Sequence, residues 1–157
     1  MSVYDLVINN GFVVDTVSKT STILNVGVTD GKIAAVTKET LCGNITIDAA
    51  GKYVCPGFID VHGHIDGHFY SAKLSACQGI TTTIGGNCGL SPLDIGRFFD
   101  EQTASGFYIH QAEFIGHSFT LRQAVGLTDT WQKASREQIK KMEALASAAL
   151  DAGACGI

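Results

Sequence analysis

The sequence lacks the features that mark membrane, secreted and nucleic-acid-binding proteins. It has no run of about 18 apolar residues, so no membrane-spanning helix is expected. The N-terminus has no basic region followed by an apolar stretch, so no signal peptide is expected. The net charge is −4 and no basic run is present, which argues against a nucleic-acid partner. Together with the cysteine usage, these absences predict a cytoplasmic protein.

Paired cysteines are also absent. The five cysteines are odd in number and scattered, without the spacing of a zinc ribbon or a redox pair. We therefore expect reduced thiols, four of which pack as small hydrophobic side chains: Cys42, Cys55, Cys77 and Cys155. What remains is an ordinary globular composition of 157 residues, 45% of them hydrophobic, which is enough to build a core.

Residues 2–53 contain short runs typical of β-strands, separated by turn residues. Asp30-Gly31 between two β-branched runs is the strongest short signal of a hairpin, and Asn9-Asn10-Gly11 predicts another turn. The expected strands are Asp5–Ile8, Phe12–Val14, Ile23–Thr29, Lys32–Thr37, Ile45–Ile47 and Ala49–Lys52. These short strands predict a small β-sandwich segment over residues 1–54. No residue in it is arranged for catalysis or for metal binding.

The stretch Val54–His68 contains the densest cluster of residues that can bind a metal. Pro56-Gly57 interrupts the preceding pattern, and Phe58–Val61 suits a buried strand. His62 and His64 follow, and residues two apart in a strand project to the same face. Two adjacent imidazoles form half of a metal site, because zinc binds neutral histidine nitrogens. The plainer alternative is a chance surface pair.

From residue 55 onward, strand-like and helix-like segments alternate. The predicted elements are a helix over Tyr70–Gln78, a strand over Ile80–Ile84, a helix over Pro92–Ser105, a strand over Ala112–Ile115, a helix over Ser135–Ala152 and the start of a strand at Ala154. This alternation predicts βαβ units around a parallel sheet. A (β/α)₈ barrel needs about 250 residues, so residues 55–157 can supply only its first three to four units.

The last predicted helix has the clearest signals. Ser135 and Gln138 fit a capping box, and Gly153 ends the helix. Apolar residues at helical spacing are expected to face the core: Ile139, Met142, Ala146, Ala149 and Leu150.

Four segments, in order, resemble the amidohydrolase superfamily and, within it, the N-acyl-D-amino-acid deacylases. They are Pro56–Asp66 with its His-x-His, Gly79–Ser91 with Gly-Asn-Cys-Gly, Phe114–Arg122 with Gly-His, and Gly153–Ile157. The resemblance covers nearly the whole chain. It implies an α/β fold, with a partial (β/α)₈ TIM-type barrel over residues 55–157 after an incomplete β-sandwich segment over residues 1–54.

The resemblance also implies a zinc-dependent hydrolase of linear amides, holding one or two Zn²⁺ ions. His62, His64 and Cys88 would be metal ligands at the ends of the first two barrel strands, where barrel enzymes carry their chemistry. A packed thiol is the alternative for Cys88. The family's other histidine ligands and its aspartate base would lie after Ile157, so no catalytic residue is expected in this chain.

Three further residues are candidate contacts for an N-acyl amino acid substrate. Asp66 follows the histidine pair, His117 ends the third predicted strand, and Arg122 could bind a carboxylate bidentately. For His117 and Arg122 a structural role in the loops is an equally good interpretation. His110 and Glu113 are assigned no role.

The leading hypothesis is the N-terminal portion of a deacylase that is inactive alone. It would act as an oligomer or with the rest of the barrel, because an unfinished parallel sheet leaves an unpaired edge. A non-catalytic remnant, or a split-enzyme subunit serving as a binding or structural module, is the alternative from another class. A hydantoinase- or dihydroorotase-like hydrolase is the alternative within the class, and Gly-Asn-Cys-Gly favours the deacylases.

Overall fold

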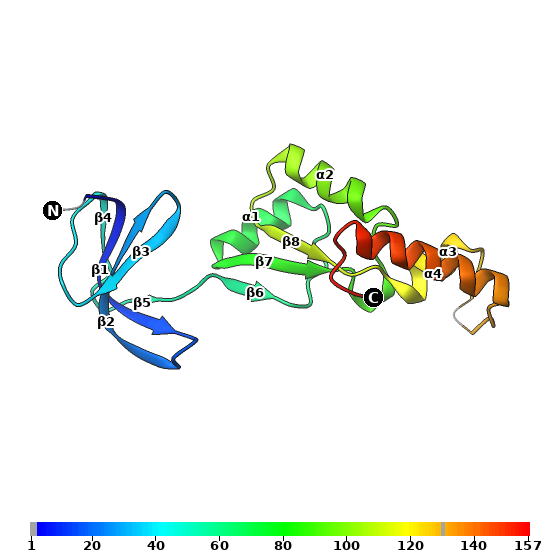
Figure 1. The fold of residues 1–157 in the computed structure, drawn as a ribbon, viewed down its shortest axis with the longest axis horizontal. Coiled ribbons are helices and arrows are strands. Elements are labelled where there is room, and N and C mark those ends of the chain that lie inside the picture. Colours follow the sequence, from blue (N-terminus) through cyan, green and yellow to red (C-terminus); the bar gives the residue numbers. More distant parts are fainter. Residues whose placement is uncertain (1–2, 130) are drawn as a thin grey trace. The chain divides into compact units, whose positions relative to one another are not determined.

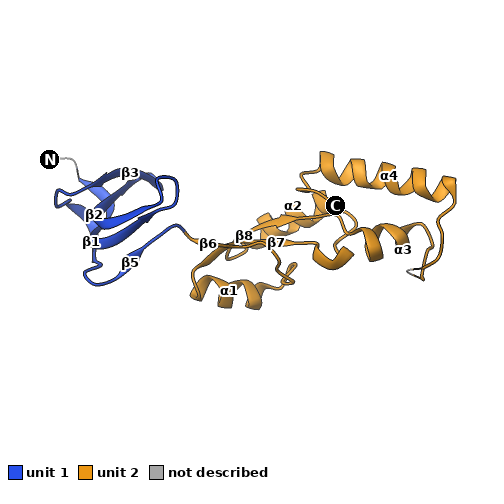
Figure 2. Ribbon diagram, turned by 90° about the horizontal axis from the view of Figure 1, so that it is seen from below, with its two compact units in different colours: residues 1–56 blue, residues 57–157 orange. Residues whose placement is uncertain are grey.

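Two units make up the part of the chain that the computed structural model describes, residues 3–129 and 131–157. The first unit ends at Pro56 and the second begins at Gly57 (Figure 2). The first contains only strands, and the second alternates strands with helices. Among the described residues, no helix is long and apolar enough to cross a membrane.

The first unit is a five-stranded sheet. Its strands are β1 (Tyr4–Asp15), β2 (Thr20–Thr29), β3 (Lys32–Thr37), β4 (Gly43–Asp48) and β5 (Tyr53–Val54). The order is β3-β2-β1-β4, and the short β5 also pairs with β1. β2 is antiparallel to both β1 and β3, whereas β4 and β5 run parallel to β1. The predicted hairpin at Asp30-Gly31 is confirmed, with positive φ angles at both turn residues.

The turn predicted at Asn9-Asn10-Gly11 is wrong. β1 runs through these residues with a change of register between Ile8 and Gly11. Asn10 takes a left-handed φ of 63°, and its N–H donates to the Asn25 side chain at 2.7 Å. The turn-type residues therefore make a bulge in a long strand, because a tertiary hydrogen bond supports it. The strand predicted over Ala49–Lys52 is also wrong, since that segment is a turn.

The second unit is built on a parallel sheet in the order β6-β7-β8 (Figure 1). Its strands are β6 (Phe58–Asp60), β7 (Ile80–Gly85) and β8 (His110–Glu113). The helices are α1 (Phe69–Cys77), α2 (Ile95–Ser105), α3 (Arg122–Ala124) and α4 (Arg136–Asp151), and the short turns are η1 (Asn87–Gly89) and η2 (His117–Leu121). The predicted α/β alternation is confirmed.

The pairing of β8 continues past its end. The Cys155 N–H donates to the Glu113 carbonyl at 2.9 Å, and the Ile115 N–H donates to the Gly156 carbonyl at 3.0 Å. The segment predicted to start a strand at Ala154 therefore makes strand-like backbone hydrogen bonds with the end of β8. It does not form a regular strand.

Capping residues set the helix boundaries in the second unit. The capping box at α4 is confirmed, with Ser135 and Gln138 each binding the other's backbone. α2 begins three residues later than predicted, because the Asp94 side chain accepts from the Arg97 N–H at 3.0 Å and caps the helix there.

A core forms where α2, α4 and the segment after β8 meet. Its buried members are Ile95, Ile115, Leu121, Leu127, Met142, Ala146, Ala149 and Ala154. The core positions predicted for α4 are thus confirmed at Met142, Ala146 and Ala149. They are wrong for Ile139 and Leu150, whose exposed fractions are 43% and 44%, because these two lie at the edge of the apolar stripe.

Two burial predictions are wrong. β6 was expected to be a buried strand, yet Phe58 and Ile59 are 58% and 61% exposed. The sequence pattern is typical of a strand that is covered on both faces, whereas β6 is an edge strand of the described sheet. The four cysteines expected to pack as small hydrophobes are all exposed, as is Cys88.

Candidate metal centre

His62, His64 and Cys88 come together in the second unit. Their ligand atoms all lie within 4.8 Å of one another, and no other such group of three occurs among the described residues. Cys88 Sγ is 3.5 Å from His62 Nε2 and 3.7 Å from His64 Nε2. The Cys88 thiol can donate its proton to one imidazole and accept an N–H from the other, so both contacts are compatible with hydrogen bonds as well as with shared ligation of a metal.

These separations fit one tetrahedral ion. Zinc binds cysteine sulfur at about 2.3 Å and histidine nitrogen at about 2.0–2.1 Å, which puts the two ligand atoms about 3.6 Å apart. All three side chains are exposed, so an ion and a further ligand can reach them. One thiolate and two imidazoles also match the chemical preference of zinc.

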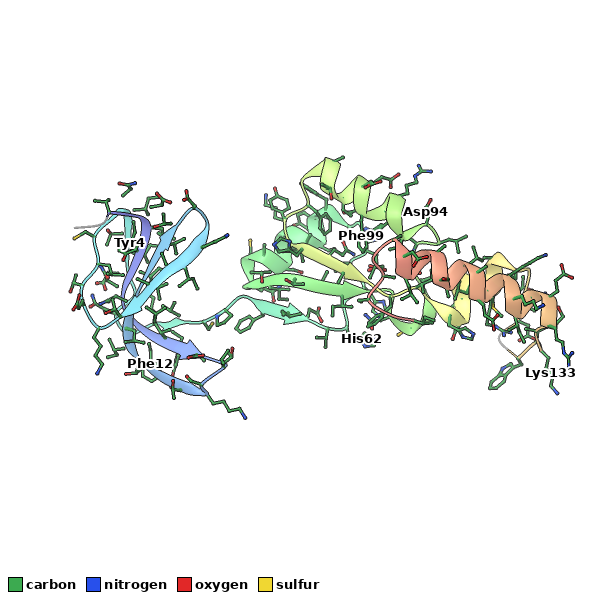
Figure 3. All side chains as sticks on the ribbon, in the orientation of Figure 1. Tyr4, Phe12, His62, Asp94, Phe99 and Lys133 are labelled. Carbon is green, nitrogen blue, oxygen red and sulfur yellow. The ribbon has the colours of Figure 1, made fainter. Side chains whose placement is uncertain are left out.

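A turn after β6 brings the two imidazoles together. β6 ends at Asp60, whose carboxylate accepts from the His62 N–H at 3.1 Å. His62 lies just beyond the end of β6 (Figure 3). The N–H of Gly63 donates to the Ile84 carbonyl of β7 at 3.0 Å. A Cβ on Gly63 would overlap the Thr83 hydroxyl, so only glycine fits there. The structure brings the predicted pair together with Cys88, but both histidines lie beyond the strand whose alternation was meant to align them.

Cys88 lies in a tight loop after β7 with a left-handed φ of 58°. The Asn87 amide donates to the Ile84 carbonyl at 2.7 Å and holds the loop against the strand end. On either side, a Cβ at Gly86 would overlap the Phe114 carbonyl, and one at Gly89 would lie 2.7 Å from Ser118. Two glycines therefore let the loop that carries Cys88 pack closely against the residues that follow β8.

Ser91 and Thr120 fasten this loop to η2. The Ser91 N–H donates to Thr120 Oγ1 at 2.8 Å, and Thr120 Oγ1 donates to the Ser91 carbonyl at 2.8 Å. Ser91 Oγ also accepts from the Gly116 N–H at 2.9 Å. We call this pair the Ser91–Thr120 latch. It joins the loop of Cys88 to the loop of His117.

His117 and Cys88 line the same cavity, which has a volume of about 260 Å³. The imidazole of His117 is exposed. The structure therefore places this predicted substrate contact beside the metal cluster.

Arg122 has a different environment. One guanidinium nitrogen donates to the carbonyls of Asp129 and Gln132, at 2.9 and 2.7 Å. These contacts tie together the loop between α3 and α4, which was the structural alternative for this residue.

Asp66 lies among buried polar groups. Its Oδ1 is 3.5 Å from Gln111 Nε2, and the same nitrogen is 3.5 Å from Glu113 Oε2. Burial raises the pKa of Asp66. Burial and the neighbouring Asp66 charge raise the pKa of Glu113 to about 8. Glu113 is fully buried, and the sequence interpretation assigned it no role. The available signal was a carboxylate at an alternating position of a strand-like run that ends in Ile115.

Comparison with known proteins shows what this arrangement resembles. A model described as the amidohydrolase family matches residues 46–124. The N-acyl-D-glutamate deacylase of Alcaligenes xylosoxydans xylosoxydans is 33% identical over 97% of this chain and 36% of its own length. The resemblance carried by the four sequence motifs is therefore confirmed.

Solved structures agree. The N-acyl-D-glutamate deacylase of Bordetella bronchiseptica, complexed with zinc and a phosphonate mimic of the tetrahedral intermediate, superposes with a TM-score of 0.87 at 31% identity, over 99% of this chain and 38% of that one. A D-aminoacylase with a binuclear metal centre superposes with a TM-score of 0.85 at 33% identity, over 98% and 38%. The chain spans a little over a third of the length of these relatives.

Proposed function

Because this chain belongs to the amidohydrolase family, we propose that it forms the metal-binding first part of a zinc-dependent hydrolase that deacylates N-acyl-D-amino acids. The relatives that it matches over nearly its whole length include a deacylase of N-acyl-D-glutamate and a D-aminoacylase. In this proposal residues 55–157 are the first three to four units of a (β/α)₈ barrel, and residues 1–54 are an incomplete β-sandwich segment.

The observation that carries the proposal is the convergence of two imidazoles and one cysteine sulfur, whose ligand atoms all lie within 4.8 Å of one another. His62, His64 and Cys88 would hold a zinc ion, and the two sulfur–nitrogen separations of 3.5 and 3.7 Å match those that such an ion requires. A zinc ion bound there supplies Lewis acidity to the hydrolysis of an amide. The three residues come from two strand ends of a parallel sheet, the edge at which barrel enzymes carry their chemistry.

The remaining site residues have separate roles in the proposal. His117, which shares a cavity with Cys88, would contact the substrate. Arg122 and Asp66 would be structural, because Arg122 binds two backbone carbonyls and Asp66 lies against Glu113 and Gln111. The general base is proposed to come from the part of the barrel that the relatives have after this region.

Turnover then requires the rest of the barrel as a partner. The exposed apolar side chains of β6 support this, because a closed barrel would cover them. A bound metal in the isolated chain would face open water, where electrostatic stabilisation of charge is weak. General acid–base catalysis, which contributes about 10²–10⁴-fold, would also be missing.

Metal analysis of the 157-residue chain tests the site. We expect one equivalent of zinc in the parent and its loss in both His62→Ala and Cys88→Ala. Cys77→Ala, at an exposed thiol at the end of α1, should keep the full zinc content. Unchanged zinc in both ligand variants would refute the site.

An activity assay tests the function separately. The zinc-loaded chain should not deacylate N-acetyl-D-amino acids alone, and it should do so when the remaining part of a full-length relative is added. Failure of every such pairing, with zinc binding intact, would favour the non-catalytic module instead.

A further inference from the structure

The layer between the sheet and the helices of the second unit contains a polar cluster. The register of β7 and β8 pairs Thr83 with Gln111 and Gly85 with Glu113. Residues two apart in a strand share a face, so Gln111, Glu113 and Ile115 point the same way. Ile115 packs into the core with residues of α2 and α4. Glu113 therefore lies on the helix-covered face, whereas the three residues of the metal cluster are exposed.

Carboxylate oxygens converge at one point of this layer. A Cβ on Gly85 would overlap both Asp66 Oδ1 and Glu113 Oε2, so the glycine makes the room that the two oxygens share. Gln111 is the third member, with its amide nitrogen 3.5 Å from each of these oxygens. Those are long contacts, at the limit of a hydrogen bond.

Unpaired oxygens are concentrated here. Glu113 Oε1, Gln111 Oε1 and Thr83 Oγ1 are buried without a hydrogen-bond partner, and so is Gln102 Oε1 of α2. Glu113 and Thr83 are 0% and 1% exposed. A half-turn of the Gln111 amide would bring its oxygen to the two carboxylates, since the two amide atoms exchange places.

Neither carboxylate forms an ion pair among the described residues, and the basic groups near Asp66 are the imidazoles of His64 and His68, which lower its pKa less than burial raises it. The two ion pairs formed among the described residues, Arg97–Glu101 and Lys141–Glu137, both lie on exposed helix surfaces elsewhere. Two acidic groups held together away from water are unfavourable unless a positive charge or a proton joins them. The pKa of Glu113 is raised because burial and the neighbouring Asp66 charge both disfavour its ionised form.

We propose that Asp66, Glu113 and Gln111 bind a divalent cation of the Mg²⁺ or Ca²⁺ class between the sheet and the helices, separate from the cluster of His62, His64 and Cys88. Every donor is an oxygen, which suits hard cations and disfavours zinc. Asp66 belongs to the loop of His64, and Glu113 belongs to β8. The cation would therefore hold the first ligand loop to the sheet. This cation site is inferred independently of the proposed hydrolysis reaction.

Calorimetric titration of the zinc-loaded chain with Mg²⁺, and separately with Ca²⁺, tests the site. We expect one equivalent of one of these ions to bind, with the larger affinity identifying which. Glu113→Gln keeps the shape and removes the charge, and should weaken binding about 10- to 100-fold or more with zinc content unchanged. Glu101→Gln, at an exposed glutamate, should bind like the parent.

Three results would overturn the proposal. The parent could bind neither ion, with Glu113→Gln raising the melting temperature, which would show a shared proton in place of a cation. Glu113→Gln could bind as tightly as the parent. A second equivalent of zinc could occupy the site in preference to Mg²⁺ and Ca²⁺. If Glu113→Gln does not fold, Asp66→Asn replaces it in the same titration, and weakened binding of Mg²⁺ or Ca²⁺ is again the expected result.

Discussion

The two units treat buried polar groups in opposite ways. In the first, the buried Asn9 and Asn25 are fully engaged: the Asn9 amide exchanges hydrogen bonds with Leu41, and Asn25 binds Asn10, Lys38 and Glu39. In the second lie all five buried side-chain atoms without a partner among the described residues. Satisfied amides fix a backbone, whereas unsatisfied oxygens are expected where a ligand binds. The unpartnered oxygens are therefore the reason that we place the proposed cation site in the second unit.

The largest expected effect that tests this contrast is a dependence of stability on pH between 4.5 and 8, which comes from Glu113 in the second unit. The folded-state pKa of Glu113 is raised to about 8 from 4.5. The folded chain then holds a proton that the unfolded chain releases, so this contribution to stability is complete below pH 4.5 and is lost as pH rises through 8. Without Mg²⁺ or Ca²⁺, we expect the free energy of unfolding to fall by roughly 2–4 kcal/mol across that window. Denaturant titrations at several pH values measure it.

Glu113→Gln is the matched control for that slope, because the variant keeps all five histidines and loses only the carboxylate. The difference between the parent and variant curves isolates Glu113. Parallel curves would contradict the predicted pKa and with it the contrast between the units.

A smaller effect is expected from the first unit. Asn25→Ala leaves the Asn10 N–H and two backbone carbonyls without their partner. Asn10, Lys38 and Glu39 are themselves exposed, so water replaces part of the lost bonding, and we expect a total loss of about 2 kcal/mol that does not change with pH. Asn44→Ala, at an exposed position of β4, should change stability by less than about 0.5 kcal/mol. Equal losses in the two variants would mean that the amide of Asn25 is not engaged in solution.

The smallest effect is expected at the Ser91–Thr120 latch, a fully hydrogen-bonded polar pair inside the second unit. Thr120→Val keeps the shape and removes both hydrogen bonds with Ser91. We expect a stability loss of about 1 kcal/mol and zinc binding weakened about tenfold, because the loop of Cys88 loses its attachment. Competition with a chelator measures the affinity, and Thr128→Val at an exposed loop position is the control. Unchanged affinity in Thr120→Val would separate the latch from the metal cluster.

Local signals in the sequence predicted much of this fold. Asp30-Gly31 gave a hairpin, Ser135 with Gln138 gave a capped helix, and the His-x-His motif located two residues that the fold brings together with Cys88. Each of these depends on residues a few positions apart, where chemistry and geometry are tightly linked.

The errors came from contacts between distant residues. Asn10 supports a bulge and not a turn because Asn25 accepts its N–H from another strand. No role could be predicted for Glu113 because its partner Asp66 is far away in the sequence. The need for glycine at position 85 is likewise visible only in the fold, where oxygens of both carboxylates lie close to its backbone. The environment of a buried acid is a property of packing, and a linear pattern does not contain it.

The left-handed backbone at Cys88 also bears on how quickly a metal is captured. A non-glycine residue in this conformation is strained by about 1–2 kcal/mol, and the close contacts of Gly86 and Gly89 maintain it. The backbone that carries the thiol is therefore in place when the chain folds, before any ion arrives. Loading would need little loop reorganisation, so the capture rate would be set by water exchange on the incoming ion and by the ionisation of one thiol.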